Sequence, residues 1–349
     1  MSTGVGLSCP GCRAEVHQQD RFCENCGQEL GGRRIALPNH EPGPPTACEA
    51  CGGLDYDADG YCAGCGQLRG APDRFDADLG AVAVVTDRGI SHARNEDAVA
   101  AAVLDGAGGA PKAAVIVVAD GVSSSEDPQV ASGTAAKTGV DACRTALLDG
   151  KPAAEAAMAG LAAAAQAVRD IAVADGHAPS CTYVSAVVQT DEHGGTEITV
   201  ANVGDSRAYW LHADAPDDPH NPPSQRLTVD DSWAQALVDA GAMDEHAAMH
   251  DPRAHTLIRW LGADGPVKPW SDSCIRTFRT TGPGVLLLCS DGLWNYLSDA
   301  TALAEVATAT APAVAARELV EFALRCGGSD NITVALVPVP WTAQPGEVQ

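Results

Sequence analysis

Two stretches of the sequence end an apolar run with an aspartate and a glycine. The first run begins at Val115 and ends in Asp120 and Gly121, and the second ends in Asp291 and Gly292. Such runs are typical of buried β-strands, so each would deliver one carboxylate to a strand end. A plain Asp-Gly turn explains either run alone. Two of them together indicate a shared acidic site, and an acidic site favours a hard cation.

Cysteines mark a second kind of site near the amino terminus. Eight of the thirteen cysteines precede residue 66 and form two copies of the pattern CxxC, ten residues, CxxC, offset by 39 residues. Four thiolates complete a tetrahedral site with no open position, so each copy is predicted to hold a structural zinc ion. Disulfides would need an oxidising compartment. The expected zinc ligands are Cys9, Cys12, Cys23 and Cys26 in the first copy and Cys48, Cys51, Cys62 and Cys65 in the second. Such short modules resemble double zinc ribbons.

The charge balance limits the partners of the chain. Its 349 residues include 46 acidic and 22 basic side chains, a formal net charge of -24. This negative field repels nucleic acid and anionic membranes, so we expect neither as a partner and expect the ribbons to bind protein. No apolar run approaches the roughly 20 residues that span a bilayer, and the amino terminus lacks the pattern of a signal peptide. We therefore expect a cytoplasmic protein.

The chain divides into a cysteine-rich part and a larger part in which strands alternate with alanine-rich helices. A proline-rich spacer separates the ribbons, and a short linker follows them. The expected boundaries are 1–35 for the first ribbon, 36–47 for the spacer, 48–70 for the second ribbon, 71–78 for the linker, 79–340 for the main domain and 341–349 for a tail. The clearest expected strands cover 81–87, 182–189, 198–203, 207–211 and 332–337, and the clearest helices 130–148, 152–174, 299–308 and 314–325.

Six motifs of the main domain, taken in order, resemble those of the metal-dependent protein phosphatases of type 2C (PPM family). Each motif alone is weak, but their order and spacing together are specific. They are Arg94-Asn95-Glu96-Asp97, Val118-Ala119-Asp120-Gly121, Val203-Gly204-Asp205-Ser206-Arg207, Leu227-Thr228-Val229-Asp230-Asp231-Ser232, Ser290-Asp291-Gly292 and Asp330-Asn331-Ile332-Thr333. The resemblance extends from about residue 79 to residue 338.

The resemblance implies an α+β fold, a four-layer α/β/β/α sandwich of two antiparallel sheets flanked by helices. It also implies two Mn2+ or Mg2+ ions at one end, with a third, weaker site. The metal ligands that it implies are Asp120 as the bridge, the carbonyl of Gly121, Asp291 and Asp330, Glu96 and Asp97 in or behind the shell, and Asp230 with Asp291 at the third ion. Asn331 and Asp205 are expected to support these ligands.

The activity that the resemblance implies is hydrolysis of phosphoserine and phosphothreonine in proteins. A water or hydroxide bridging two metal ions attacks phosphorus, so no phosphoenzyme is required. Phosphoproteins are then the substrates, and a serine/threonine kinase or its substrates are the partners expected from the family.

Two departures from the family pattern affect the expected site. His92 stands where an arginine usually grips the substrate phosphate, and we expect Arg94 to serve instead, with His92 contributing when protonated. Val122 stands where eukaryotic members carry a histidine proposed as general acid, so a metal-bound water would have to protonate the leaving group. These departures leave open a second hypothesis, a catalytically inactive scaffold that carries the ribbons as an adaptor.

Zinc analysis of the purified protein should find two ions per chain, because each ribbon supplies four thiolates. The zinc should survive a mild chelation that removes Mn2+ or Mg2+, since thiolate sites hold zinc far more firmly than carboxylates hold those cations. Finding one zinc ion or none would contradict the double-ribbon interpretation.

Overall fold

The computed structural model describes most of the catalytic part of the chain and portions of the cysteine-rich part. The described residues are 7–8, 14–16, 24–26, 33–38, 47–48, 50–55, 61–66, 73–106, 110–171, 178–190, 195–212, 222–262, 264–266, 268–271 and 273–341. Among these residues, no helix is both long enough and apolar enough to cross a bilayer.

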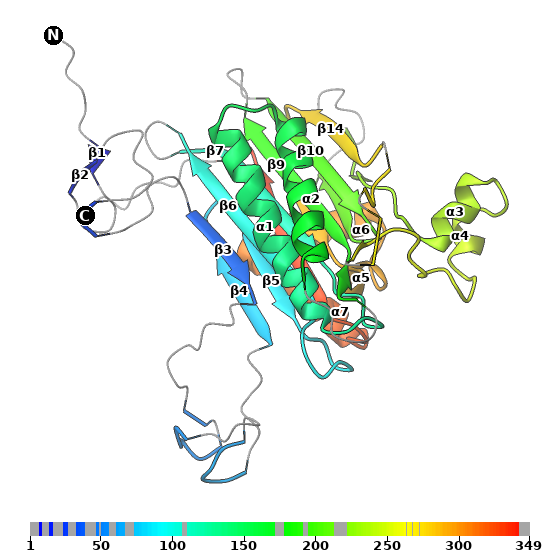
Figure 1. Cartoon of the computed structure of the whole chain (residues 1–349), viewed down its shortest axis with the longest axis horizontal. Helices are drawn as coiled ribbons and strands as arrows, with labels where there is room; N and C mark the ends of the chain where they lie inside the picture. Colours follow the sequence, from blue (N-terminus) through cyan, green and yellow to red (C-terminus); the bar gives the residue numbers. More distant parts are fainter. Residues whose placement is uncertain are drawn as a thin grey trace.

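Two six-stranded antiparallel sheets form the centre of the molecule (Figure 1). The first sheet has the order β14-β10-β9-β7-β6-β3, with strands Ile275–Thr280, Thr196–Val203, Tyr183–Thr190, Pro111–Ala119, Ala98–Asp105 and Arg33–Leu37. The second has the order β12-β11-β15-β16-β5-β4, with strands Gln225–Arg226, Arg207–Leu211, Gly284–Cys289, Ile332–Val339, Ala83–Asp87 and Arg74–Asp78. Two short pairs complete the strands, β1 (Leu7–Ser8) with β2 (Glu15–Val16) and β8 (Ser180–Cys181) with β13 (Leu261–Gly262).

Helices cover the outer face of each sheet, so four layers result. The first sheet is covered by α1 (Pro128–Leu148) and α2 (Ala153–Arg169). The second is covered by α5 (Asp291–Trp294), α6 (Ala300–Ala307) and α7 (Pro312–Arg325). Two short helices, α3 (Trp233–Asp239) and α4 (Glu245–Ala248), project from one side of the sandwich (Figure 1). The expected α/β/β/α sandwich is therefore confirmed.

Strand β7 shows how the sequence builds these layers. Ala114, Ile116 and Val118 face the second sheet, whereas Val115 and Val117 face the helices. Because side chains alternate along a strand, a strand with both faces covered must be apolar throughout. This explains the unbroken apolar run that leads to Asp120.

The sheets extend beyond the boundary expected at residue 79. The segment Arg33–Leu37 pairs with β6, and Arg74–Asp78 pairs with β5, so residues assigned from sequence to ribbon, spacer and linker form edge strands of the two sheets. Leu37 is opposite Val99, and Arg74 is opposite Asp87. The second ribbon is therefore an insertion between two edge strands that belong to different sheets.

Replacing Leu37 by alanine tests whether β3 belongs to the folded body. Leu37 is buried in the core between the sheets, so its truncation should lower the free energy of unfolding by about 2 kcal/mol or more. Urea unfolding followed by circular dichroism would measure the loss.

The matched control is Arg33→Ala on the same strand. The Arg33 side chain is exposed, and its one ion pair among the described residues is with Asp105 at the surface, so this change should cost less than about 1 kcal/mol. An equal, small effect of both substitutions would mean that β3 contributes nothing to the core.

Candidate functional site

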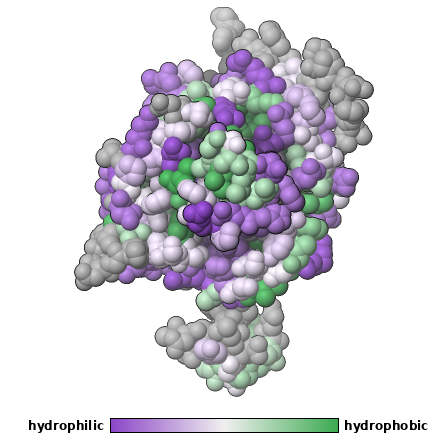
Figure 2. Space-filling model, turned by 90° about the vertical axis from the view of Figure 1, so that its right-hand side faces the viewer, coloured by the Kyte–Doolittle hydropathy of each residue, from purple (hydrophilic) through white to green (hydrophobic). Residues whose placement is uncertain are grey.

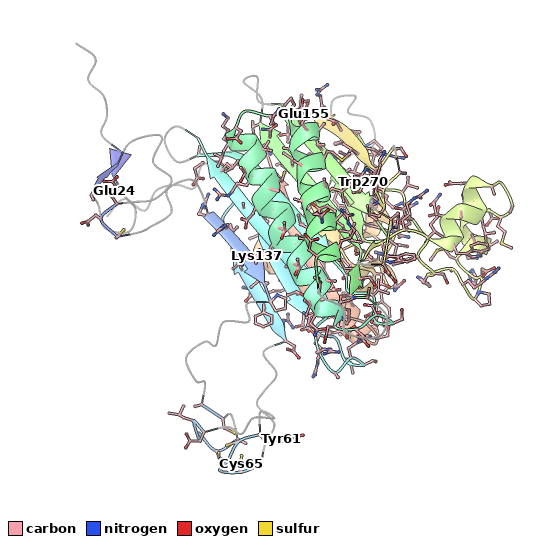
Figure 3. All side chains as sticks on the ribbon, viewed as in Figure 1. Glu24, Tyr61, Cys65, Lys137, Glu155 and Trp270 are labelled. Atoms are coloured by element: carbon pink, nitrogen blue, oxygen red, sulfur yellow. The ribbon has the colours of Figure 1, made fainter. Side chains whose placement is uncertain are left out.

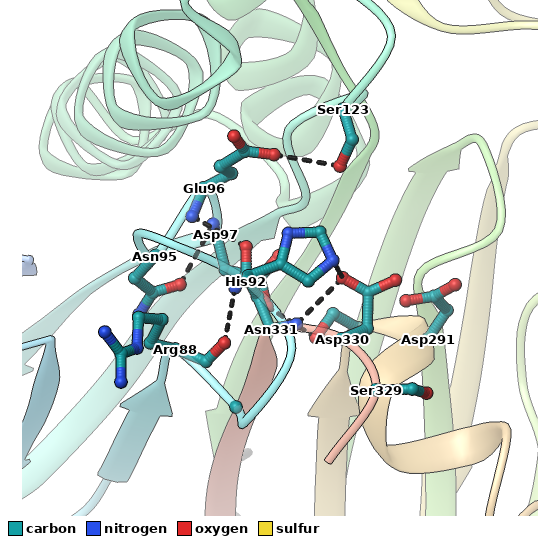
Figure 4. A network of polar contacts seen from close by, with 12 residues as sticks. Arg88, His92, Asn95, Glu96, Asp97, Ser123, Asp291, Ser329, Asp330 and Asn331 are labelled. Carbon is teal, nitrogen blue, oxygen red and sulfur yellow. Dashed lines mark hydrogen bonds and ion pairs between the residues drawn. The ribbon is translucent and has the colours of Figure 1, made fainter.

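Four aspartates from four segments meet at one end of the sandwich, and three of them, Asp97, Asp291 and Asp330, are labelled in Figure 4. Asp120 follows β7, and Asp291 begins α5 directly after β15. Asp330 precedes β16, and Asp97 precedes β6, whereas the side chain of the neighbouring Glu96 points towards Ser123 (Figure 4). The ends of four strands therefore deliver the residues that the sequence singled out to a common place.

Asp97 is held from the second sheet. The hydroxyls of Ser290 and Thr333 donate to its Oδ2 at 2.6 and 2.7 Å. Its Oδ1 is buried and has no hydrogen-bond partner within the described part of the chain. A buried carboxylate oxygen without a donor is costly unless a cation satisfies it, so this atom fits a metal site.

Asn331 fastens the loop before β6 to the start of β16 (Figure 4). Its Oδ1 accepts from the backbone N–H of Glu96 at 2.7 Å. Its Nδ2 donates to the carbonyls of Arg88 and Arg94 at 2.7 and 3.1 Å. One buried amide thus fixes the backbone of the 88–96 loop, which carries His92, Arg94 and Glu96.

Two glycines allow the site loops to touch. A Cβ on Gly121 would lie 2.6 Å from the carbonyl oxygen of Glu96, and one on Gly292 would overlap the carbonyl of Asn331. Both Asp-Gly pairs therefore use glycine for close backbone approach, not for an unusual turn. The aspartate supplies the carboxylate, and the glycine lets the neighbouring loop lie against it.

Burial and neighbouring carboxylates raise the pKa values of three of these aspartates, Asp97, Asp120 and Asp291. Burial, with Asp97, Asp291, Asp205 and Asp330 nearby, raises the pKa of Asp120 well above its usual value. Burial is also the main cause that raises the pKa values of Asp97 and Asp291 to about 7. Like charges in a desolvated cluster repel, and divalent cations bound between them remove this repulsion. Burial, repulsion and the donor set of carboxylates therefore all fit Mn2+ or Mg2+.

Arg94 and His92 both lie on the 88–96 loop, in different settings. The Arg94 Nε is 3.3 Å from Glu96 Oε1, and its side chain is 53% exposed and so accessible to a ligand. The His92 Nε2 is 3.1 Å from Asp330 Oδ1 (Figure 4). Ser123 donates to the other oxygen of Glu96 at 2.8 Å. Glu96 is thus oriented from both sides.

The 122–125 loop is tied down by its serines. Ser123 bonds Glu96, and Ser125 donates to the carbonyl of Val122 and accepts from the N–H of Ser180. The Val122 N–H donates in turn to the carbonyl of Ser180. The sequence departs here from the family pattern, and the hydroxyls hold the loop against β8.

Asp230 lies apart from the carboxylate cluster, in an ion pair. Its Oδ2 is 2.6 Å from Arg207 Nη2, and Arg207 Nε also contacts both of its oxygens. Both side chains are about 95% buried. The partner that the structure brings to Asp291 is Asp205, together with His255, with one ligand atom of each within 4.8 Å of the others. The Gly204-Asp205-Ser206 turn was a sequence signal for Asp205, whereas no local pattern indicated His255.

A cavity of about 530 Å3 opens over these carboxylates. One wall carries Asp120 and the 122–125 loop, and the other carries His255, Leu257 and Trp260 from the segment after α4. The cavity joins the acidic cluster to a partly apolar wall and is wide enough for a phosphorylated side chain with its neighbours.

The second cysteine group forms a compact four-thiol site. Cys48 Sγ is 3.6 Å from Cys65 Sγ, and Cys51 Sγ is 3.4 Å from Cys62 Sγ. Ligands about 2.3 Å from a tetrahedral zinc ion lie about 3.8 Å apart, so the spacing fits zinc. Gly52 has a φ of 74° and donates to the carbonyl of Cys48, which closes the turn around the first thiol pair. Figure 3 shows Cys65 on this module, apart from the sandwich.

The first cysteine group lies mostly outside the described residues. Cys9, Cys12 and Cys23 are outside them, and Cys26 is described and exposed. Its zinc site therefore stays a prediction from the repeated sequence pattern.

Raising the pH should destabilise the protein when it is free of Mn2+ and Mg2+. Asp97 and Asp291 have pKa values of about 7 in the folded chain and ordinary, lower values when unfolded. Between about pH 4 and pH 7 the folded state therefore binds more protons, so stability falls as the pH rises and levels off above pH 7. Thermal melts from pH 5 to pH 8, with the ribbon zinc retained, would measure the fall.

Added Mn2+ should reverse this loss, by about 2.7 kcal/mol per site at 100 times the dissociation constant. Asp97→Asn should give a shallower pH dependence, because one shifted carboxyl is removed. A melting temperature that rises steadily from pH 5 to pH 8 without metal would contradict the raised pKa values.

Comparisons with known proteins agree with this geometry. Residues 85–325 match the family model described as protein phosphatase 2C. The serine/threonine phosphatase Stp of Listeria welshimeri is 32% identical over 260 residues, which cover 72% of this chain and 93% of that protein.

Solved structures give the same result. The serine/threonine phosphatase PstP/Ppp of Mycobacterium tuberculosis is 26% identical, with a TM-score of 0.54 over 73% of this chain and 96% of that one. The catalytic domain of PstP in complex with two manganese ions is 25% identical, with a TM-score of 0.52 over 74% and 97%. With the family model matching well over half of its length, the chain belongs to the protein phosphatase 2C family.

Proposed function

We propose that the chain is a serine/threonine phosphoprotein phosphatase that hydrolyses phosphomonoesters with two divalent cations. The observation that carries this function is the cluster of buried carboxylates at the ends of four strands, beneath an open cavity. Membership of the protein phosphatase 2C family supports it. Neither the described residues nor the comparisons favour the inactive scaffold.

The cations would be held by Asp120 between them, the Gly121 carbonyl, and Asp291 and Asp330. Glu96 and Asp97 would complete the shell, directly or through water. When bound, Mn2+ or Mg2+ would supply Lewis-acid activation of water and neutralise phosphate charge. Support comes from the all-oxygen donor set and from the two manganese ions in the related PstP structure.

The 88–96 loop would bind the substrate phosphate. Arg94 is the more suitable residue, because its guanidinium is exposed and can bond two phosphate oxygens. His92 lies against Asp330, where it would hold that carboxylate and, when protonated, add positive charge beside the phosphate. Asn331 would act through both, because it fixes the backbone of the loop.

The ribbons would each hold one structural zinc ion and bind a protein partner. In the second ribbon, support comes from the four-thiol geometry and from the exposed side chains of Leu54 and Tyr61. The strands that flank this ribbon end at the carboxylate side, since Leu37 is opposite Val99 and Arg74 is opposite Asp87. A protein bound there would stand near the cavity, as a phosphoprotein substrate or its kinase requires.

Substituting either of two proposed metal ligands, the bridging Asp120 or Asp291, should abolish the proposed activity. Asp120→Asn and Asp291→Asn should each lower the rate of p-nitrophenyl phosphate hydrolysis with Mn2+ by more than about 100-fold. Substituting residues that only support metal ligands already lowers metal affinity or activity by up to about 100-fold. The control Asp170→Asn at the end of α2, where the side chain bonds Gln166, should leave the rate unchanged. Full activity of both site variants would refute the site, and an inactive wild type would favour the scaffold.

Truncating Arg94 should weaken phosphate binding more than it slows the chemical step. Arg94→Ala should raise KM for a phosphothreonine peptide by about 10-fold or more, since charge-assisted hydrogen bonds contribute about 1.5–3 kcal/mol. Arg94→Lys should recover part of this loss, because it restores the charge but not the two-pronged geometry. An unchanged KM would contradict the role of Arg94 and indicate that His92 binds the phosphate.

A further inference from the structure

Two side chains in the wall of the cavity meet over a glycine. Trp260 directly precedes β13 and Asp264 follows it, and both line the cavity over the carboxylates. A Cβ on Gly262 would lie 3.0 Å from Asp264 Oδ1 and 3.0 Å from Trp260 Nε1, so these two atoms are at most about 6 Å apart. The missing side chain of Gly262 therefore leaves room for an indole and a carboxylate to lie side by side.

The chain around this pair is held to the sandwich from two sides. Before Trp260, the Ile258 N–H donates to the Asp231 carbonyl at 2.8 Å, and Arg259 Nη1 contacts Asp231 Oδ1 at 2.5 Å. After it, Leu261 is fully buried and pairs with β8. Helices α3 and α4 project on the face turned to the viewer in Figure 2, and residues 257–262 return the chain from them to the sheets. The pair is therefore in place before a ligand binds.

The pair lies about two strand spacings from the carboxylate cluster. Gly121, directly after Asp120, forms a bridge with Cys181, and Cys181 is paired in turn with Leu261. Neighbouring strands are about 4.8 Å apart, so the backbone of β13 is about 10 Å from Gly121. An extended peptide covers this distance in about three residues. A side chain up to about three positions from a phosphorylated residue can therefore reach the pair.

Asp264 differs from the other aspartates of the cavity in its surroundings. It is exposed, and none of the ion pairs in the described part of the chain includes it. The bound cations would compensate the carboxylates of the main cluster, whereas Asp264 stands beyond β8. None of the described residues that line the cavity is a lysine or an arginine. The wall thus presents a negative charge beside an aromatic ring, without a positive partner of its own.

An aromatic ring next to a carboxylate suits an organic cation. A guanidinium or ammonium group is attracted by the π face of an indole and forms a charge-assisted hydrogen bond with a carboxylate. Arginine suits such a pair better than lysine, because its planar group can stack on the ring while its N–H groups reach the carboxylate.

We propose that Trp260 and Asp264 bind a basic side chain of the phosphoprotein substrate, arginine in preference to lysine, within about three residues of the phosphorylated residue. This subsite rests on the proposed function, because phosphate bound at the metal ions would fix the peptide in the cavity. A substrate with an acidic residue at the same position would be repelled by Asp264. The net charge of -24 of the chain favours basic phosphorylation sites in the same sense.

Binding of non-hydrolysable phosphonate peptides to the full-length protein, with its zinc retained and Mn2+ present, tests the subsite without relying on turnover. Each peptide would carry one arginine, at one of the three positions on either side of the phosphonate, and a matched peptide would carry the uncharged isostere citrulline. For at least one position, fluorescence anisotropy should give a dissociation constant about 10-fold lower with arginine than with citrulline. Lysine at that position should give a smaller difference.

Variants of the pair test whether this preference belongs to Trp260 and Asp264. Asp264→Asn should reduce the preference to about 2-fold or less, and Trp260→Leu should reduce it by about 3-fold, because leucine has no π face. Asp264→Lys should make a peptide with glutamate at that position bind more tightly than one with glutamine. Loss of folding cannot cause such a reversal.

The matched control is Asp239→Asn at the end of α3. It removes the same charge from a side chain that is exposed, bonds Gln235 and lies outside the cavity lining, so it should behave as the wild type.

Equal affinity for arginine and citrulline at every position, or a preference that survives Asp264→Asn, would overturn the proposal. Failure of the phosphatase function would appear separately, as an absence of p-nitrophenyl phosphate hydrolysis by the wild type with Mn2+, whereas the difference in peptide affinity would still decide for or against the subsite.

Discussion

The repulsion between buried carboxylates is the constraint on which the functional end of this protein depends. Asp97, Asp120 and Asp291 lie within one desolvated cluster. Burial raises the pKa of each carboxyl, and the neighbouring carboxylates raise it further. Such a cluster is stable only if the backbone holds its members in place and cations compensate the charge. The two stacked sheets supply the first condition, because the ends of their strands cannot move apart without disrupting the core between them.

The contacts around the cluster hold its carboxylates and the neighbouring loop in place. The Asn331 amide fixes the backbone of the 88–96 loop beside the cluster. The hydroxyls of Ser290 and Thr333 orient Asp97 without adding a competing charge. Arg207 neutralises Asp230, so that carboxylate belongs to the supporting structure beside the cluster. The chain thus pairs Asp230 with arginine, whereas Asp97, Asp120 and Asp291 form no ion pair with arginine among the described residues.

Sequence reasoning identified the elements whose local signal matched their environment. The strands before Asp120 and Asp291 were predictable because both of their faces are buried, and the motif order identified the aspartates that the structure brings together. Strand β6 (Ala98–Asp105) was missing from the expected elements, because its alanines carry little strand preference and only its position between β3 and β7 makes it extended. The positions of His255 beside Asp205 and Asp291, and of Ser123 beside Glu96, depend on contacts with residues far away in sequence, which no local pattern encodes. The edge strands β3 and β4 were assigned to the first ribbon, the spacer and the linker because they are short, charged and close to the cysteine pairs.

Those two edge strands make part of the amino-terminal region an integral part of the sandwich. Strand β3 belongs to one sheet and β4 to the other. The intervening residues 38–73 therefore connect two strands that are both paired within the folded body. A single protease cut within this connection would not release the first ribbon. The amino-terminal fragment would stay bound to the larger fragment without a covalent link, because β3 pairs with β6 over five residues and Leu37 is buried. In evolutionary terms, the region before residue 79 cannot be treated as a removable appendage, because its deletion would also take strands from both sheets.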